Sequence, residues 1–134
     1  MNTLTIDTSD KVAKFGLFCD DKLTDSLEWE AHRELSKTFY VKLDEILTRN
    51  KLNYGDLDSI IVVRGPGSFT GLRIGIVIVN AFAYALKIET AGVIQKEKMN
   101  LEEIYREGKK HFKKGQIIEP FYGREPTITT KKKQ

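Results

Sequence analysis

Alternating hydrophobic and polar residues predict three strands in the first thirty residues of the chain. Leu4 and Ile6 alternate with polar neighbours, and Ala13, Phe15 and Leu17 share one face of a second strand. Such alternation is typical of strands with one face in a core. An acidic pair at 20–21 makes the turn to a third strand, so we expect an antiparallel meander. The third strand places its apolar residues at Leu23, Leu27 and Trp29.

The following segments switch between helical and strand patterns. Apolar residues at three- and four-residue steps predict a helix over about 34–50. The β-branched run 59–63 predicts a strand buried on both faces, and 88–94 predicts one more strand. Between them, 72–86 predicts a helix that is apolar nearly all round. Such a helix must be buried on more than one side or covered by a partner.

A third helix is predicted over about 100–114. Asn100 is a suitable cap, glutamates occupy the first turn and lysines the last, which complements the helix dipole. Gly115 is expected to end this helix, and 117–118 to form a short strand.

The order of these elements predicts the fold class. Strand, strand, strand, helix, strand, helix, strand is the order of the half-domain of ribonuclease-H-like and actin-like folds. We therefore expect an α/β protein with a mixed sheet of about five strands and helices packed on it. The expected units are an actin-like N-terminal subdomain at 1–95, a basic helical bridge at 96–116 and an extended basic C-terminal tail at 117–134.

The amino-acid composition excludes several classes of protein. The chain has 134 residues, 40% hydrophobic and 31% charged, which is ordinary for a globular domain. One cysteine, Cys19, excludes an internal disulfide, and two histidines make a zinc site unexpected. No secretory signal is visible, and the apolar stretch 74–86 is short for a membrane span. The sequence predicts a cytoplasmic protein without membrane contact.

Positive charge gathers late in the chain. Residues 96–134 hold 11 basic and 6 acidic side chains, whereas residues 1–95 hold 11 basic and 13 acidic ones. Two interpretations stay open. The end of the chain is a solvated tail, or its lysines contact RNA phosphates, which clustered lysines attract without regard to sequence. The candidate RNA contacts are Lys131, Lys132 and Lys133.

A glycine-rich segment joins the predicted strand 59–63 to the helix 72–86. Free backbone N–H groups and the helix dipole favour an anion at such a place. The segment lacks the Lys-Ser/Thr pair of a Walker loop, so a rigid structural or interface loop competes with phosphate binding. Gly67 is expected to need a positive φ. The candidate residues are Arg64, Gly65, Pro66, Gly67, Ser68, Phe69, Thr70, Gly71 and Arg73.

The end of the first predicted strand is a second candidate site. Actin-like ATPases place an aspartate near this point to organise a metal and phosphates, followed by turns that contain glycine. Asp7, Thr8 and Ser9 stand here, and residues 8–11 contain no glycine. The pattern favours a turn or capping role for Asp7 over a nucleotide site, which would be vestigial. The sequence predicts no catalytic and no metal-binding residues.

The same residues resemble the TsaB family, also called YeaZ. The resemblance is carried by Ile6-Asp7-Thr8-Ser9, by His32 with Ser36, and above all by the run from Arg64 to Gly75. It covers the chain up to about residue 95. The segment 119–126 is also similar to the Pro-x-Tyr-x-Arg tail of many TsaB chains. A usual TsaB has a second actin-like subdomain before that tail, so the resemblance implies a short form lacking most of it.

The resemblance implies a function. TsaB-like proteins are non-catalytic scaffolds that bind a TsaD-like catalytic subunit and a TsaE-like ATPase. Together these proteins add a threonylcarbamoyl group to adenosine 37 of tRNA. A homodimer is also implied, with tRNA contacted indirectly or through the basic tail. The alternative is a nucleotide-binding ATPase of the actin-like superfamily acting on its own. No cofactor is expected on this chain alone; ATP or ADP at an interface with the partner stays open.

The resemblance also implies a docking surface. In the family, the two N-terminal helices contact their counterparts in TsaD or in a second TsaB. The corresponding docking residues here are Leu35, Phe39, Leu43, Leu72, Ile76, Val79 and Phe82.

Overall fold

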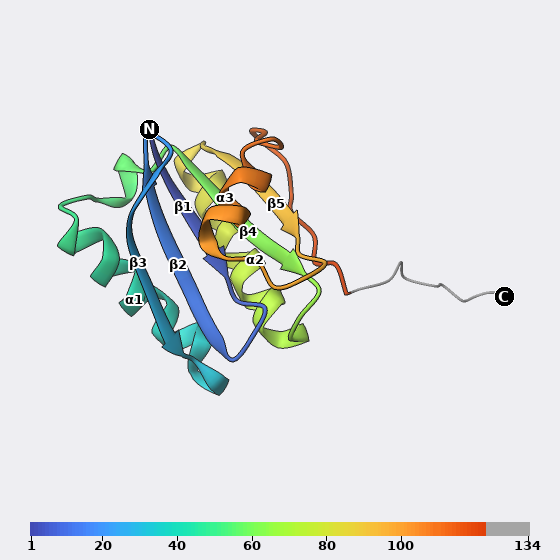
Figure 1. The fold of residues 1–134 in the computed structure, drawn as a ribbon. Helices are drawn as coiled ribbons and strands as arrows, with labels where there is room; N and C mark the ends of the chain where they lie inside the picture. The colour runs from blue at the N-terminus through green and yellow to red at the C-terminus, as the bar shows by residue number, and fades with distance from the viewer. Residues whose placement is uncertain (123–134) are drawn as a thin grey trace, which may run out of the picture.

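A five-stranded mixed sheet forms the centre of the molecule (Figure 1). The computed structural model describes residues 1–122, apart from the side chain of His32. The strands lie in the order β3-β2-β1-β4-β5, which confirms the predicted ribonuclease-H-like arrangement. Their bounds are β1 (Asn2–Asp7), β2 (Val12–Cys19), β3 (Lys22–Glu30), β4 (Ser59–Gly65) and β5 (Glu89–Ile94).

The pairing of the strands has two parts. β1, β2 and β3 form the predicted antiparallel meander, with Asn2 opposite Cys19 at one end of the first pair. Asp20 and Asp21 make the turn after β2 with φ of 49° and 71°, a conformation that aspartate tolerates better than most residues. β4 lies parallel to β1 and to β5. The carboxyl ends of β1 and β4 therefore lie side by side at the same end of the sheet.

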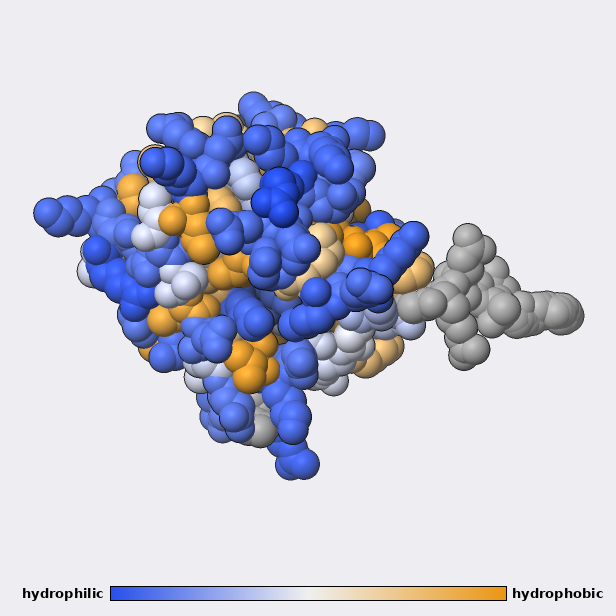
Figure 2. Space-filling model, viewed as in Figure 1, coloured by the Kyte–Doolittle hydropathy of each residue, from blue (hydrophilic) through white to orange (hydrophobic). Residues whose placement is uncertain are grey.

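Helices cover both faces of the sheet. α1 (Leu35–Arg49), preceded by the 3₁₀ turn η1 (His32–Glu34), and α2 (Phe69–Leu86) lie on one face. A second 3₁₀ turn, η2 (Tyr54–Asp56), precedes β4. α3 (Leu101–Gly108) lies on the opposite face, in front of the sheet in Figure 1. The surface seen from the α3 side is mostly hydrophilic, with scattered hydrophobic patches (Figure 2).

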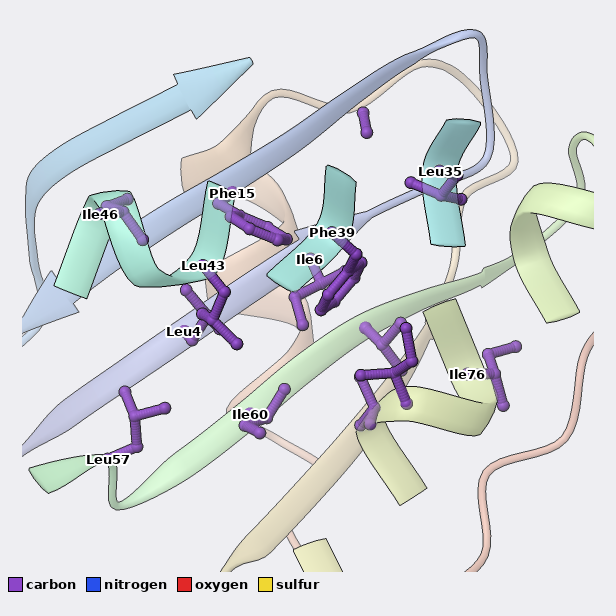
Figure 3. Close-up of a cluster of buried hydrophobic side chains, with 14 of the residues drawn as sticks. Leu4, Ile6, Phe15, Leu35, Phe39, Leu43, Ile46, Leu57, Ile60 and Ile76 are labelled. Carbon is purple, nitrogen blue, oxygen red and sulfur yellow. The ribbon is translucent and has the colours of Figure 1, made fainter. Parts of the chain in front are cut away.

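The main core lies between the sheet and the two long helices. Leu35, Phe39, Leu43 and Ile46 of α1 point at side chains of β1, β2 and β4 (Figure 3). Phe39 meets Phe15 edge to face, with ring centroids 5.0 Å apart. Burying each such side chain stabilises the fold by about 1.5–3 kcal/mol. The apolar stripe of α1 is therefore buried in this chain's own core.

A smaller core lies on the α3 side. Phe18, whose side chain points away from the main core, stacks on Tyr105 of α3 with ring centroids 4.1 Å apart. Ile61 and Val63 of β4 belong to the same cluster. β4 is buried on both faces, as its β-branched run predicted.

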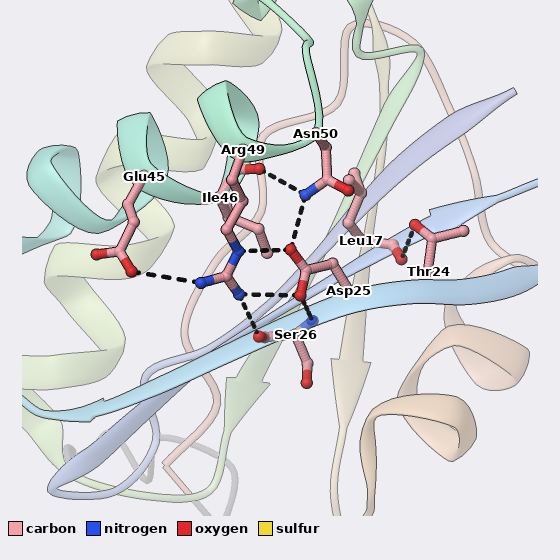
Figure 4. A network of polar contacts seen from close by, with 8 residues as sticks. All are labelled: Leu17, Thr24, Asp25, Ser26, Glu45, Ile46, Arg49 and Asn50. Carbon is pink, nitrogen blue, oxygen red and sulfur yellow. Dashed lines mark hydrogen bonds and ion pairs between the residues drawn. The ribbon is translucent and has the colours of Figure 1, made fainter.

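A polar contact ties β3 to the end of α1 (Figure 4). Arg49 donates from Nε and Nη2 to the two carboxylate oxygens of Asp25, at 2.6 and 2.9 Å. Asn50 adds a bond to the same carboxylate at 2.7 Å. Donation by Arg49 is the main reason that the pKa of Asp25 falls to about 2.

The structure corrects three predicted boundaries. α2 begins at Phe69 rather than Leu72, because Ser68 already caps it. α3 ends at Gly108, so the lysines from 109 onward follow the helix and Gly115 does not end it. Residues 117–118 form no strand; Lys113 makes an isolated bridge to Thr90 of β5 instead.

α2 is also long and apolar enough, by length and composition, to cross a membrane. Its 18 residues exceed the stretch 74–86 considered in the sequence. In this fold Leu72, Ile76 and Val79 lie in the core against the sheet, and 28% of the 18-residue window is buried.

Candidate functional site

The glycine-rich segment is mostly regular structure. β4 continues to Gly65 and α2 starts at Phe69, which leaves only Pro66, Gly67 and Ser68 as the loop. The hydroxyl oxygen of Ser68 accepts a hydrogen bond from the backbone N–H of Gly71 at 3.4 Å. Ser68 is therefore the N-cap of α2.

The two candidate sites of the sequence lie against each other. The backbone N–H of Ser68 donates to the carbonyl oxygen of Ser9 at 2.8 Å, and the Thr8 hydroxyl donates to the carbonyl oxygen of Gly71 at 2.8 Å. A Cβ at Gly75 would stand 2.3 Å from the Thr8 hydroxyl oxygen. Glycine is required there because the helix touches the β1–β2 turn.

Gly67 has a different role from the one expected. Its φ is not positive; in this segment Gly65 holds the positive value, 137°. A Cβ at Gly67 would instead meet the backbone of Ser9 at 2.4 Å. The sequence identified the constrained glycine correctly in position but attributed it to the wrong cause, since packing against a distant turn leaves no local signal.

Asp7 is buried at the end of β1, with 1% of its surface exposed. Its Oδ1 accepts hydrogen bonds from the backbone N–H and the hydroxyl of Ser9, at 2.9 and 2.5 Å. This is the turn role that the sequence favoured. Among the described residues no group hydrogen-bonds to Oδ2, and the ammonium of Lys98 lies 3.6 Å from it. The lysine supplies the charge that offsets this buried carboxylate.

The guanidinium groups of Arg64 and Arg73 both have contacts away from the backbone N–H groups of the loop. Arg64 donates from Nε to the carbonyl oxygen of Glu119 at 2.8 Å. The guanidinium of Arg73 lies over the ring of Phe69, 5.2 Å from its centroid. Ser68 N–H and Gly71 N–H already have partners. The geometry therefore favours a packed loop beside an exposed surface over a phosphate cradle.

The chain returns to this loop through residues 113–122, here called the strap. The amide of Asn80 exchanges two hydrogen bonds of 3.0 Å with the backbone of Ile118. Phe121 N–H then donates to the carbonyl oxygen of Arg64 at 2.7 Å, and Tyr122 stacks on Phe69 with centroids 4.8 Å apart. The strap thus brings residues 119–122, the described part of the TsaB-like segment, beside the start of α2. Lys131, Lys132 and Lys133 lie outside the described residues.

The predicted docking residues are not surface residues. Leu35, Phe39, Leu43, Leu72, Ile76 and Val79 are buried in this chain's own core, and Phe82 is partly buried against Tyr54. That assignment is corrected, because the apolar stripes of both helices face the sheet.

Other residues form the surface that these helices expose. Val77 is 65% and Tyr84 88% exposed, and Tyr40 and Phe69 are exposed as well. Val77, Tyr40 and Phe69 border an apolar groove of about 490 Å³ between α1 and α2, beside the loop. The groove is lined by Ser36, Tyr40, Phe69, Thr70, Arg73, Ile74, Val77 and Ile78.

Two polar residues of this region escaped sequence reasoning. Gln95 donates to the Ser9 hydroxyl at 3.1 Å and accepts from Met99 N–H at 3.2 Å, which joins the end of β5 to the β1–β2 turn. Asn80 anchors the strap. A lone amide in an otherwise apolar helix was the available signal for Asn80. Within residues 1–122, no group of three or more His, Cys, Asp or Glu side chains is placed to hold a metal ion.

Residues 29–111 match the family model described as TsaD, tRNA N6-adenosine threonylcarbamoyltransferase. The chain is 32% identical over 93 residues to the tRNA threonylcarbamoyladenosine biosynthesis protein TsaB of Escherichia coli, covering 69% of this chain and 40% of that protein.

Solved structures agree. YeaZ from Pseudomonas aeruginosa superimposes with a TM-score of 0.65 and 27% identity, over 69% of this chain and 43% of that one. RuvC of T. thermophilus, solved with a Holliday junction substrate, has a TM-score of 0.52 at 11% identity, over 91% of this chain and 85% of that one, and shares the fold alone.

The chain thus spans less than half the length of the E. coli and P. aeruginosa relatives. It belongs to the TsaD family of threonylcarbamoyltransferase-related proteins, as a homologue of TsaB (YeaZ).

Proposed function

We propose that this chain is a non-catalytic subunit of the machinery that adds the threonylcarbamoyl group to adenosine 37 of tRNA. It acts by binding a TsaD-like catalytic subunit. The single observation that carries the proposal is the exposed apolar face of α2, with the groove that it forms with α1. Exposed apolar surface of this kind marks protein–protein contacts, and membership of the family supplies the partner's class.

The position of the loop supports the same proposal. Phe69, Tyr122 and Arg73 stack at the mouth of the groove, where the loop and the strap meet. Aromatic and arginine side chains are enriched where interfaces carry most of their binding energy. The loop would then serve as a rigid border of the interface, and the buried core residues would hold the two helices at a fixed spacing.

A nucleotide-binding ATPase is the rival function, and it has less support. A phosphate would have to reach the β1–β2 turn, where Ser9 contacts the loop backbone and Lys98 already lies beside Asp7. The observation in its favour is that Oδ2 of Asp7 is buried and accepts no hydrogen bond from the described residues. Calorimetry with ATP and Mg²⁺ separates the two functions, because binding and hydrolysis by the isolated chain would support the rival.

The docking proposal is tested by co-purification with the TsaD-like protein of the same genome. Val77→Asp places a charge on the exposed face without touching the core, and should abolish the complex. Ile117→Asp is a matched control, since Ile117 is 74% exposed and lies on the strap. Retention of the complex by Val77→Asp, or equal loss by both variants, would refute the α2 face as the docking surface.

A further inference from the structure

A second concave surface runs along the free edge of β5. It is a cleft of about 670 Å³ that shares no lining residue with the groove between α1 and α2. Its walls are the end of β5, the turn after α3 and the strap. Four basic side chains line it: Arg64 of β4, Lys96 after β5, and Lys110 and Lys113 of the turn that leads from α3 into the strap.

The path of the strap creates this cleft. The strap pairs with β5 only at Thr90, which exchanges two 3.0 Å hydrogen bonds with Lys113. It then turns to Asn80 on α2. Because alternate residues of a strand direct their N–H and C=O groups the same way, Gly92 and Ile94 direct theirs, like Thr90, toward the cleft. The cleft therefore has backbone donors along its floor.

Gly92 lets an arginine reach the cleft. A Cβ at this position would stand 2.8 Å from Cδ of Arg64 and 3.2 Å from Cγ2 of Ile118. Arg64 thus passes close over Gly92 to reach the strap, where its Nε donates to Glu119. Its two terminal nitrogens have no hydrogen-bond partner among residues 1–122.

The cleft carries excess positive charge. Its four basic side chains face two carboxylates, Glu107 and Glu119, so the net charge is +2. Glu107 is already paired, with His111 at 3.1 Å and Lys110 at 3.3 Å, and these contacts lower its pKa. Lys96 and Lys113 pair with no carboxylate in the described part of the chain. Such cations repel one another and favour an anion between them.

We propose that this cleft binds the phosphates of an RNA strand. The proposal deepens the function proposed above and rests on it for the choice of RNA, because the substrate there is a tRNA. The cations come from three segments that line an open cleft of about 670 Å³, a space larger than one small anion fills. That distribution suits successive phosphates of a polyanion better than a single small anion. The cleft also lies in the region where the chain concentrates its basic residues.

The test is binding of a fluorescein-labelled single-stranded oligoribonucleotide by the full chain over a series of salt concentrations. Lys96→Gln combined with Lys113→Gln removes the two unpaired lysines. Affinity at low salt should fall on the order of tenfold, and the slope of log K against log salt should become shallower by about 1.4, roughly 0.7 for each lost phosphate contact. The matched control combines Lys22→Gln with Lys51→Gln, two exposed lysines outside the cleft.

Several outcomes would overturn the cleft assignment. These are unchanged affinity and slope in the Lys96/Lys113 variant, equal losses in the Lys22/Lys51 control, or displacement of the RNA by ATP at equal phosphate concentration. Loss of all RNA binding on replacing Lys131, Lys132 and Lys133 with Gln, with no effect of the cleft variant, would assign the RNA to the tail instead.

Co-purification with the TsaD-like protein separates this proposal from the proposed function. The Lys96/Lys113 variant should keep that complex, since the cleft and the groove share no residue. Loss of the complex would make the cleft part of the protein interface and refute RNA binding as its role. A wild-type chain that binds RNA through the cleft but no TsaD-like partner would refute the proposed function and leave the cleft assignment standing.

Discussion

The carbonyl oxygen of Ser9 lies only 2.4 Å from the position that a Cβ of residue 67 would occupy. The β1–β2 turn and the loop before α2 are therefore in backbone contact, strengthened by the bond from Ser68 N–H to the same oxygen. This contact fixes the start of α2, and with it Phe69 and the mouth of the groove. The TsaB-like loop sequence acts here through close packing.

Gly67→Ala tests that relationship. We expect a loss of about 1–3 kcal/mol in the free energy of unfolding, because the methyl group forces the loop away from Ser9. Urea denaturation measures it. Gly55→Ala is the control, since a Cβ there meets nothing within 4 Å, and its effect should stay within about 0.5 kcal/mol. Equal stability of the two variants would show that the loop does not need this contact.

Asn80→Ala should release the strap from α2. The substitution removes both side-chain hydrogen bonds to Ile118, including the acceptor of its buried N–H, at a cost of about 1–3 kcal/mol. Hydrogen exchange followed by mass spectrometry should show faster exchange in residues 113–122 than in β4. Exchange that is faster throughout the chain, or nowhere, would mean that Asn80 is not the anchor of the strap.

Asp25 predicts a specific dependence of stability on pH. Its pKa is about 2 in the folded chain, against an ordinary value of 3.8. A lowered pKa stabilises the fold above the ordinary value, and that stabilisation is lost as pH falls from about 4 to about 2. Asp25→Asn should cost about 1 kcal/mol at neutral pH and should lose less stability over that range.

Chemical denaturation at a series of pH values from neutral to 2 checks this prediction. Glu28→Gln is the matched control, an exposed carboxylate on the same strand, and should follow the wild type. Parallel pH profiles for wild type and Asp25→Asn would exclude the Arg49 contact as the source of this acid sensitivity (Figure 4).

The strands and the main helices could be predicted from the sequence because each carries a local period. The stripe of Leu35, Phe39 and Leu43 predicts a helix wherever it is found, and the β-branched run of β4 predicts a buried strand. The prediction that this apolar stripe of α1 faces a partner protein was wrong. The sequence shows that a face is apolar, but not whether the protein's own sheet or a partner covers it.

The features of the fold and the site that could not be predicted depend on contacts between segments distant in the sequence. Asn80 meets Ile118 and Arg64 meets Glu119 only after the chain has folded, and neither pair has a sequence signature. The cleft along β5 arises in the same way, from a strap that leaves the sheet edge after one bridge. Lys113 and Lys114 were assigned to a helix, and the charge of Lys113 lies in the cleft wall instead.

The most direct test of the central claim is threonylcarbamoylation of tRNA in a reconstituted reaction. It would contain the TsaD-like and TsaE-like proteins of the same genome and a threonylcarbamoyl-adenylate donor, with and without this chain. We expect modification at adenosine 37 that requires the chain, fails with Val77→Asp and persists with Leu23→Asp, a change at an exposed apolar residue of β3 outside both the groove and the cleft. Equal modification without the chain, or full activity of Val77→Asp, would contradict the central claim.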